Sequence, residues 1–134
     1  MSFTKEETIQ QLLEDLKSPH GVVRSAAAKR LGELKSKEAV HALTEILKED
    51  RDVLVRSSAA SALGEIGSEA KEAVETLIKI MQKDRTIGVR LGAAVALGKI
   101  GSEEALPVLQ KIIEEEKDTA LRSWVAHAIR KIQK

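Results

Sequence analysis

The sequence predicts an all-α protein, an α-solenoid of four stacked helix hairpins. A string of ten residues occurs four times, beginning at Val23, Val55, Val89 and Leu121. The arginines that follow lie at positions 24, 56, 90 and 122, so the spacings are 32, 34 and 32 residues. A period in this range is typical of arrays in which each unit buries its apolar face against its neighbours. Aromatic residues are nearly absent, which favours closely stacked helices rich in Ala and Leu over one compact core.

A second periodic segment lies between the repeated strings. Its apolar residues recur at spacings of three and four, the pattern of one helical face. The four sets are Ile9, Leu12, Leu13 and Leu16; Ala39, Leu43, Ile46 and Leu47; Val74, Leu77, Ile80 and Met81; and Leu106, Leu109, Ile112 and Ile113. Each repeat therefore consists of an outer helix and an inner helix, eight helices in all. We expect one domain over residues 1–134, with repeats at about 4–35, 36–67, 68–101 and 102–134.

Polar residues at the expected helix starts predict the boundaries. Thr4 and Glu7 have the spacing of a capping box for the first helix. Asp52 and Asp118 stand four residues before their arginines, where the N-caps of inner helices belong. Pro107 falls within the last outer helix, where we expect a kink.

Two groups of glycines recur in the repeats. Gly67–Ser68 and Gly101–Ser102 are expected to pair a helix-ending glycine with a serine that caps the next helix. Gly32, Gly64 and Gly98 fall inside inner helices, where glycine costs about 1 kcal/mol relative to alanine. Because this cost recurs at one repeat position, we expect a neighbouring backbone to approach too closely for a side chain.

The repeated arginines are interpreted as structural rather than as a phosphate site. Each stands beside a helix start, with aspartates nearby in the sequence. Partly buried arginines need such partners. The predicted ladder comprises Arg24, Arg56, Arg90 and Arg122, with Asp50, Asp52, Asp84 and Asp118 as candidate partners.

The string Val-Arg-x-x-Ala-Ala-x-Ala-Leu-Gly-x-Ile-Gly follows a leucine-rich helix that ends in Lys-Asp or Glu-Asp. This pattern resembles the HEAT-like repeats named after phycobilisome lyase subunits, over essentially the whole chain. The resemblance implies a right-handed solenoid whose inner helices line the concave face. It also implies a scaffold for protein partners, or a subunit of an enzyme that attaches or detaches bilins. Arg30, Ile129 and Arg130 depart from the pattern at the two edges of the array.

The first, second, fifth and ninth residues after each arginine vary, and a helix places them along one side. We expect this side to be the concave surface. Its first half is small and polar, whereas its second half is apolar with a basic edge. The predicted partner-binding residues are Leu91, Val95, Lys99, Trp124, His127 and Lys131. Trp is enriched among interface hot spots. The alternative is that Trp124 caps the array or mediates self-association through the C-terminal repeat.

No recognisable motif for catalysis or for cofactor or metal binding is present. The chain has no cysteine, and His20, His41 and His127 lie far apart in the sequence. The net charge of +1 and the mixed charges of the predicted groove argue against nucleic-acid binding, which favours a basic stripe. Residues 1–7 lack the features of a signal peptide, and no apolar run approaches the roughly 18 residues of a membrane span. We therefore expect a cytoplasmic protein.

Together these features predict a non-catalytic scaffold that binds a protein on the concave face lined by the second helix of each repeat, with no cofactor. Two alternatives remain. One is a catalytic or non-catalytic subunit of a bilin lyase-like enzyme, and the other is a weak nucleic-acid-binding clamp.

Overall fold

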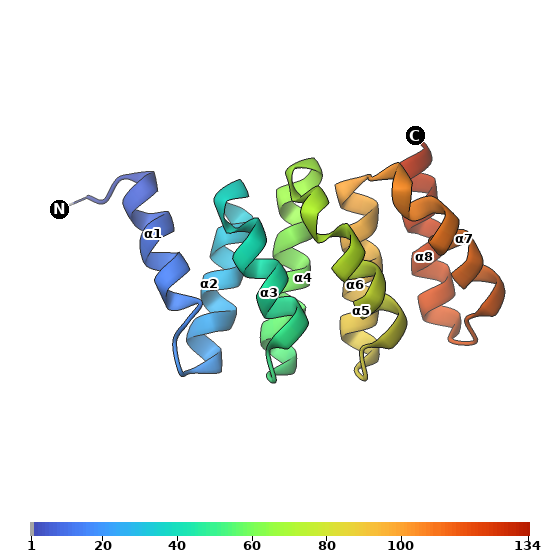
Figure 1. The fold of residues 1–134 in the computed structure, drawn as a ribbon, viewed down its shortest axis with the longest axis horizontal. Helices are drawn as coiled ribbons and strands as arrows, with labels where there is room; N and C mark the ends of the chain where they lie inside the picture. Colours follow the sequence, from blue (N-terminus) through green and yellow to red (C-terminus); the bar gives the residue numbers. More distant parts are fainter. Residues whose placement is uncertain (1) are drawn as a thin grey trace.

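The computed structural model describes residues 2–134, which form two layers of helices (Figure 1). The outer layer consists of α1 (Lys5–Asp15), α3 (Val40–Glu49), α5 (Val74–Lys83) and α7 (Leu106–Glu115). The inner layer consists of α2 (Gly21–Glu33), α4 (Val53–Ile66), α6 (Ile87–Ile100) and α8 (Thr119–Gln133). Short 3-10 helices, η1 (Lys37–Ala39), η2 (Gly67–Ala73) and η3 (Glu103–Ala105), lead into the last three outer helices. The predicted all-α solenoid and its eight α-helices are confirmed for the described residues.

The predicted N-caps are present. The Thr4 hydroxyl accepts a hydrogen bond from the amide of Glu7, whose carboxylate accepts one from the amide of Thr4. Asp52 accepts from the amide of Leu54, and Asp118 caps α8 in a similar way. Each carboxylate satisfies an amide that has no acceptor inside its helix. These caps set the points at which α1, α4 and α8 begin.

The connections from inner to outer helices differ in part from expectation. Gly67 and Gly101 end α4 and α6 with φ of 77° and 74°, which confirms them as helix-ending glycines. The predicted serine caps are wrong, because Ser68 lies within η2 and Ser102 makes no capping hydrogen bond. A 3-10 turn, rather than a serine, carries the chain into the outer helix. Pro107 lies in the first turn of α7, where its missing N–H breaks no helical hydrogen bond, so the reason for the expected kink disappears.

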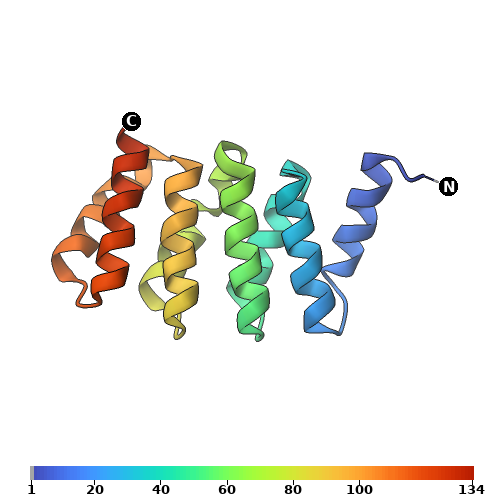
Figure 2. The same cartoon turned by 180° about the vertical axis from the view of Figure 1, so that it is seen from behind.

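Successive inner helices pack against one another at the repeated glycines. A Cβ on Gly32 would lie 2.7 Å from Cα of Ala62, in α4. The same contact recurs between Gly64 and Ala96, and between Gly98 and Ala128, at 3.0 Å in both cases. The predicted close approach is therefore confirmed. The outer helices make far fewer direct contacts with each other, so the inner layer follows the shorter arc and forms the concave side. Figure 2 shows the four inner helices side by side in front of the outer helices.

The core is a row of equivalent layers rather than one centre. Inner helices bury the same leucine of the repeat, and the outer helices contribute leucines opposite. Leu31, Leu63, Leu97, Leu43, Leu77 and Leu109 are all fully buried. Phe3 and Trp124 are both exposed, so the core contains no aromatic ring. Small and aliphatic side chains alone fill the space between the layers.

A ladder of ion pairs joins consecutive repeats next to the loops that lead from outer to inner helices. In each rung, an arginine of an inner helix reaches the carboxylate at the end of the next outer helix. The rungs are Arg24 with Asp50 at 2.8 Å, Arg56 with Asp84 at 3.0 Å, and Arg90 with Glu116 at 2.5 Å. Arg122 is exposed, and no further outer helix follows it in the described residues. The prediction is confirmed for three arginines, with Glu116 in place of an aspartate in the third rung.

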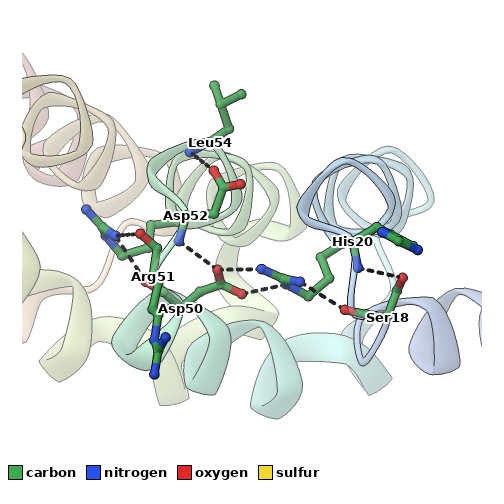
Figure 3. A network of polar contacts seen from close by, with 8 residues as sticks. Ser18, His20, Asp50, Arg51, Asp52 and Leu54 are labelled. Carbon is green, nitrogen blue, oxygen red and sulfur yellow. Dashed lines mark hydrogen bonds and ion pairs between the residues drawn. The ribbon is translucent and has the colours of Figure 1, made fainter.

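Each rung also fixes the loop backbone (Figure 3). Arg56 donates to the carbonyl oxygens of Asp50 and Arg51, at 3.0 and 3.2 Å. Asp50 accepts from the amide of Asp52 at 2.9 Å. Burial raises the pKa of Asp50, but the hydrogen bonds from Arg24 and from the Asp52 amide outweigh it, and the pKa is lowered. The charged carboxylate of Asp50 therefore stabilises both the contact between the repeats and the conformation of the loop.

The glycines allow a matched test of the packing. We expect Gly32→Ala to lower the free energy of unfolding by about 1 to 3 kcal/mol, because the added methyl group overpacks the interface with Ala62. A Cβ added to Gly92, inside α6, would meet no heavy atom closer than 4.0 Å. Gly92→Ala should therefore raise the free energy of unfolding by up to about 1 kcal/mol. Urea unfolding followed by circular dichroism measures both, and effects of the same sign would contradict the close-approach explanation.

The ladder predicts a large difference between two arginines. Arg56 is 5 % exposed, and its removal leaves the carboxylate of Asp84 buried without a counter-charge. We expect Arg56→Met to lower the free energy of unfolding by about 3 to 5 kcal/mol. Arg122→Met, at the same repeat position but exposed, serves as the control and should change it by less than about 0.5 kcal/mol. Similar losses in the two variants would refute the ladder.

Candidate partner-binding surface

The predicted binding residues lie on the concave side of α6 and α8. Lys99, Trp124, His127 and Lys131 are exposed, whereas Leu91 and Val95 are half-buried. Trp124 retains 43 % of its surface exposed although it is the largest side chain in the protein. Its ring meets that of His127 edge to face, with centroids 5.7 Å apart and planes at 86°. This contact orients the indole on the surface of α8.

Leu91 is only partly accessible on the concave side. It packs against the core and belongs to the first position after the repeated arginine. In the first two repeats, that position in α2 meets the second position in α4, because Ser25 and Ser58 share a hydrogen bond at 2.6 Å. Leu91 and Trp124 occupy the corresponding positions of α6 and α8. Leu91 and Trp124 therefore lie at positions that face each other across α6 and α8.

Lys99 is already engaged within the concave face. Its Nζ atom lies 2.8 Å from Oε1 of Glu65, on the neighbouring inner helix. The hydrogen bond and the charge of Lys99 lower the pKa of Glu65. Lys35 adds a hydrogen bond to the main-chain oxygen of Glu65 at 2.9 Å. The basic edge expected at this point is therefore partly neutralised, and Lys131 remains its exposed lysine on α8.

A hollow on the concave side lies between α4 and α6, at Gly92. This residue was not among the predicted partner-binding residues. The hollow has a volume of about 150 Å³, and its lining consists of Ser61, Gly64, Gly92, Val95, Ala96 and Lys99. Gly92 keeps it open, because a side chain there would project from the concave side of α6. The signal in the sequence was the departure from Ala26 and Ser58, which hold this repeat position in α2 and α4. Val95, which was predicted, forms part of the same lining.

Two exposed apolar residues on the inner layer were also missed. Val22 is 81 % exposed and Leu54 is 66 % exposed. Each stands two residues before its arginine, hence one helical turn before Ala26 and Ser58, and on the same side of its helix. The exposed side formed by the variable positions after each arginine therefore extends one helical turn further toward the start of the helix than predicted.

The first half of the concave face carries more polar side chains. A second hollow, of about 490 Å³, lies between α2 and α4 and is lined by Lys29, Glu33, Ser57, Ser58, Ser61, Ala62 and Glu65. A larger one, of about 900 Å³, lies beside α1 and includes Phe3, Ile9 and several glutamates, away from the predicted residues. Among residues 2–134, no cluster of three His, Cys, Asp or Glu side chains has the geometry to hold a metal ion. No helix of this part is both long and apolar enough to span a bilayer.

Comparison with known proteins identifies the family. A family model described as HEAT repeats matches residues 7–85 and again 46–130, which together cover most of the chain. The chain belongs to the HEAT repeat family. Its arginine ladder and its glycine contacts are thus features of a HEAT array.

The HEAT array is also similar to a solved structure, the complex of CpcE and CpcF of phycocyanin lyase from Nostoc sp. PCC7120. The TM-score is 0.78 at 20% sequence identity, over 92% of this chain and 85% of that chain. At this identity the likeness shows the shared fold. A search of curated proteins finds no match.

The histidines do not gather on the concave face of the HEAT array. His41 lies on the outer helix α3, and its Nδ1 atom is 2.8 Å from Oε2 of Glu72 in the next repeat. The hydrogen bond with Glu72, together with the charge of that carboxylate, raises the pKa of His41. This pair links α3 to η2 of the next repeat.

The His41 pair predicts a pH dependence. We expect NMR titration to place the pKa of His41 above the ordinary 6.5, and Glu72→Gln to lower it. Since the pKa is raised on folding, the pair stabilises the array fully below the ordinary pKa, and the contribution is lost as the pH rises through the raised value. An unchanged His41 titration in Glu72→Gln would exclude the pair in solution.

Proposed function

We propose that this HEAT array is a non-catalytic scaffold that binds a partner protein on its concave face, centred on α6 and α8. The observation that carries the proposal is Gly92, a glycine in the middle of a helix without an internal packing reason. A Cβ at this position would have no neighbour closer than 4.0 Å. Glycine costs about 1 kcal/mol at such a position. A group from outside that fills the hollow beside Val95 would explain why no side chain occupies it.

The size and lining of the hollow indicate what fits there. It is an open depression of about 150 Å³, which is room for one side chain. One leucine or phenylalanine side chain of a partner therefore suits it, with Val95 and Ala96 as apolar walls. Burial of such a side chain contributes about 1.5 to 3 kcal/mol.

Trp124 provides a second, neighbouring contact. Its exposed surface is large, and the edge-to-face contact with His127 limits the orientations that the indole adopts. A side chain already held in place loses little conformational entropy on binding. Exposed tryptophan with a supporting neighbour is typical of interface hot spots.

The titratable groups support a non-catalytic role. The acidic and basic groups with shifted pKa values include Arg24, His41, Asp50, Glu65 and Glu116, and each is engaged with a partner inside the array. These contacts link repeats or fix loops. We also propose that this scaffold acts in the cytoplasm.

A bilin lyase-like subunit is the second candidate, and the similarity to the CpcE and CpcF complex is the observation that favours it. Such a subunit requires a tetrapyrrole and a second chain. Bilin absorbance that appears on co-expression with lyase subunits and a phycobiliprotein would support it. The structure gives less support to a nucleic-acid clamp, because Lys99 is paired with Glu65. Binding of nucleic acid that falls steeply with salt in a gel-shift assay would support the clamp.

The test is affinity capture with mass spectrometry from the source organism, with wild type, Gly92→Leu and Trp124→Asp as baits. Gly92→Leu fills the hollow and Trp124→Asp removes the apolar contact, so we expect both to lose the same partner, by at least about tenfold. Gln82→Leu adds the same side chain on the exposed side of α5 and is the matched control.

Circular dichroism and light scattering of all four proteins accompany the capture. A partner that both concave variants retain would contradict the proposal. A wild-type dimer that Trp124→Asp dissociates would instead support self-association through the C-terminal repeat.

A further inference from the structure

The loops that lead from outer to inner helices form an edge with an excess of exposed positive charge. We define the loop edge as residues 14–24, 48–56, 82–90 and 114–122. Its exposed cations are Lys17, Lys48, Arg51, Lys83, Arg85, Lys117 and Arg122, and its exposed carboxylates are Glu14, Glu49, Glu114 and Glu115. Lys17 pairs with Glu14, so the excess of positive charge is greatest at the two middle loops, where Lys48, Arg51, Lys83 and Arg85 stand against Glu49 alone. The whole chain carries a net charge of only +1. The positive charge is therefore concentrated locally, which whole-chain composition does not reveal.

The reason lies in the ladder. Five further carboxylates of the loop edge are turned toward the protein: Asp50, Asp84 and Glu116 pair with arginines, and Asp52 and Asp118 cap helices. Arg51 and Arg85 have no ion pair within the described residues, and Arg51 extends away from the network of Asp50 (Figure 3). The three connections from inner to outer helices at the opposite edge, residues 34–39, 67–73 and 101–105, have the reverse balance, with exposed Glu38, Glu69, Glu72, Glu103 and Glu104 against Lys35, Lys37 and Lys71. Lys131 and Lys134 are exposed beside them, at the end of α8.

Exposed apolar side chains lie at the same edge. Val22, Val53, Leu54 and Ile87 are exposed in the first turns of α2, α4 and α6. These turns stand side by side along one edge in both views (Figures 1 and 2). Val22 and Leu54 face the concave side, which makes them continuous with the surface of the proposed function.

The spacing of this apolar row matches that of a helix. Closely packed helices have axes about 8 to 10 Å apart, and the glycine contacts place the inner helices in this class. Seven residues of an α-helix span about 10.5 Å. A helix laid across α2, α4 and α6 therefore presents one apolar residue to each inner helix if its apolar residues recur about every seven positions.

We propose that the partner docks through an acidic amphipathic helix that crosses the first turns of the inner helices, with its carboxylates facing the loop edge. Its apolar side contacts Val22 and Leu54, at equivalent positions of α2 and α4, and Ile87, which lies one residue nearer the start of α6 because Gly88 holds the equivalent position there. Its acidic side faces Arg51 and Arg85. Because Val22 and Leu54 face the concave side, a curved-in groove suits a single helix better than a flat bilayer. This inference rests on the proposed function, since it names the partner of the same concave surface.

Selection from a random peptide display library tests the inference. The baits are wild type, Arg51→Glu/Arg85→Glu and, as the matched control on the opposite edge, Lys37→Glu/Lys71→Glu. Enriched peptides are then synthesised, and their affinities are measured by fluorescence anisotropy at several salt concentrations. Gly92→Leu and Val22→Asp/Leu54→Asp are measured with the same peptides, and circular dichroism verifies that each variant is folded.

We expect wild type to enrich peptides with acidic residues beside apolar residues at helical spacing. Arg51→Glu/Arg85→Glu should bind them at least about tenfold more weakly, with the difference largest at low salt. The control pair should bind as wild type does. Val22→Asp/Leu54→Asp should lose binding at all salt concentrations, because apolar contacts are not screened.

Peptides without an acidic bias, absence of any enrichment, or equal losses in the two charge-reversed proteins would each overturn the inference. Binding to vesicles of anionic lipid that falls with Arg51→Glu/Arg85→Glu, without peptide enrichment, would overturn it in favour of a membrane surface. If Gly92→Leu alone abolishes binding, the acidic helix is wrong and the proposed concave site stands. If Gly92→Leu is without effect while charge reversal removes binding, the acidic helix is supported and the hollow is not its anchor.

Discussion

The close approach of successive inner helices is the constraint on which the rest of this structure depends. At Gly32, Gly64 and Gly98, the backbone of one helix presses on an alanine of the next, with no room for a Cβ at Gly32. Because the outer helices do not approach each other in this way, the array curves toward the inner layer. The concave face, the exposure of Trp124 and the hollow at Gly92 all follow from that curvature.

The arginine ladder has a consequence beyond stability. Each rung consumes a carboxylate that would otherwise be exposed on a loop, as Asp50 and Asp84 show. The lysines and arginines that flank these aspartates in the sequence remain outside. The same bonds that hold consecutive repeats in register therefore leave one edge of the molecule positively charged, although acidic and basic residues are nearly balanced in number.

The fold was predictable because one set of physical requirements recurs four times in the sequence. Glycine at a close contact, leucine in the core and arginine beside an aspartate each identify a repeat position. The site was less predictable, since the pattern shows which positions vary but not what each side chain meets. Leu91 varies although it packs against the core, and Lys99 varies although it pairs with Glu65 on the neighbouring inner helix. Glu116 takes the place of the expected aspartate in the third rung, and its carboxylate also accepts from the amide two residues later, as those of Asp50 and Asp84 do.

Two glycines of α6 differ in whether internal packing explains them. Gly98 would place a Cβ 3.0 Å from the backbone of Ala128, so the fold explains its lack of a side chain. Gly92 stands less than two turns earlier on the same helix, and nothing inside the protein explains it. Alanine there would strengthen the helix at no steric cost. Gly92 therefore makes the helix less stable than it could be. It lies on the concave surface beside Val95 and one inner helix away from the exposed Trp124. A requirement that comes from another molecule best explains it.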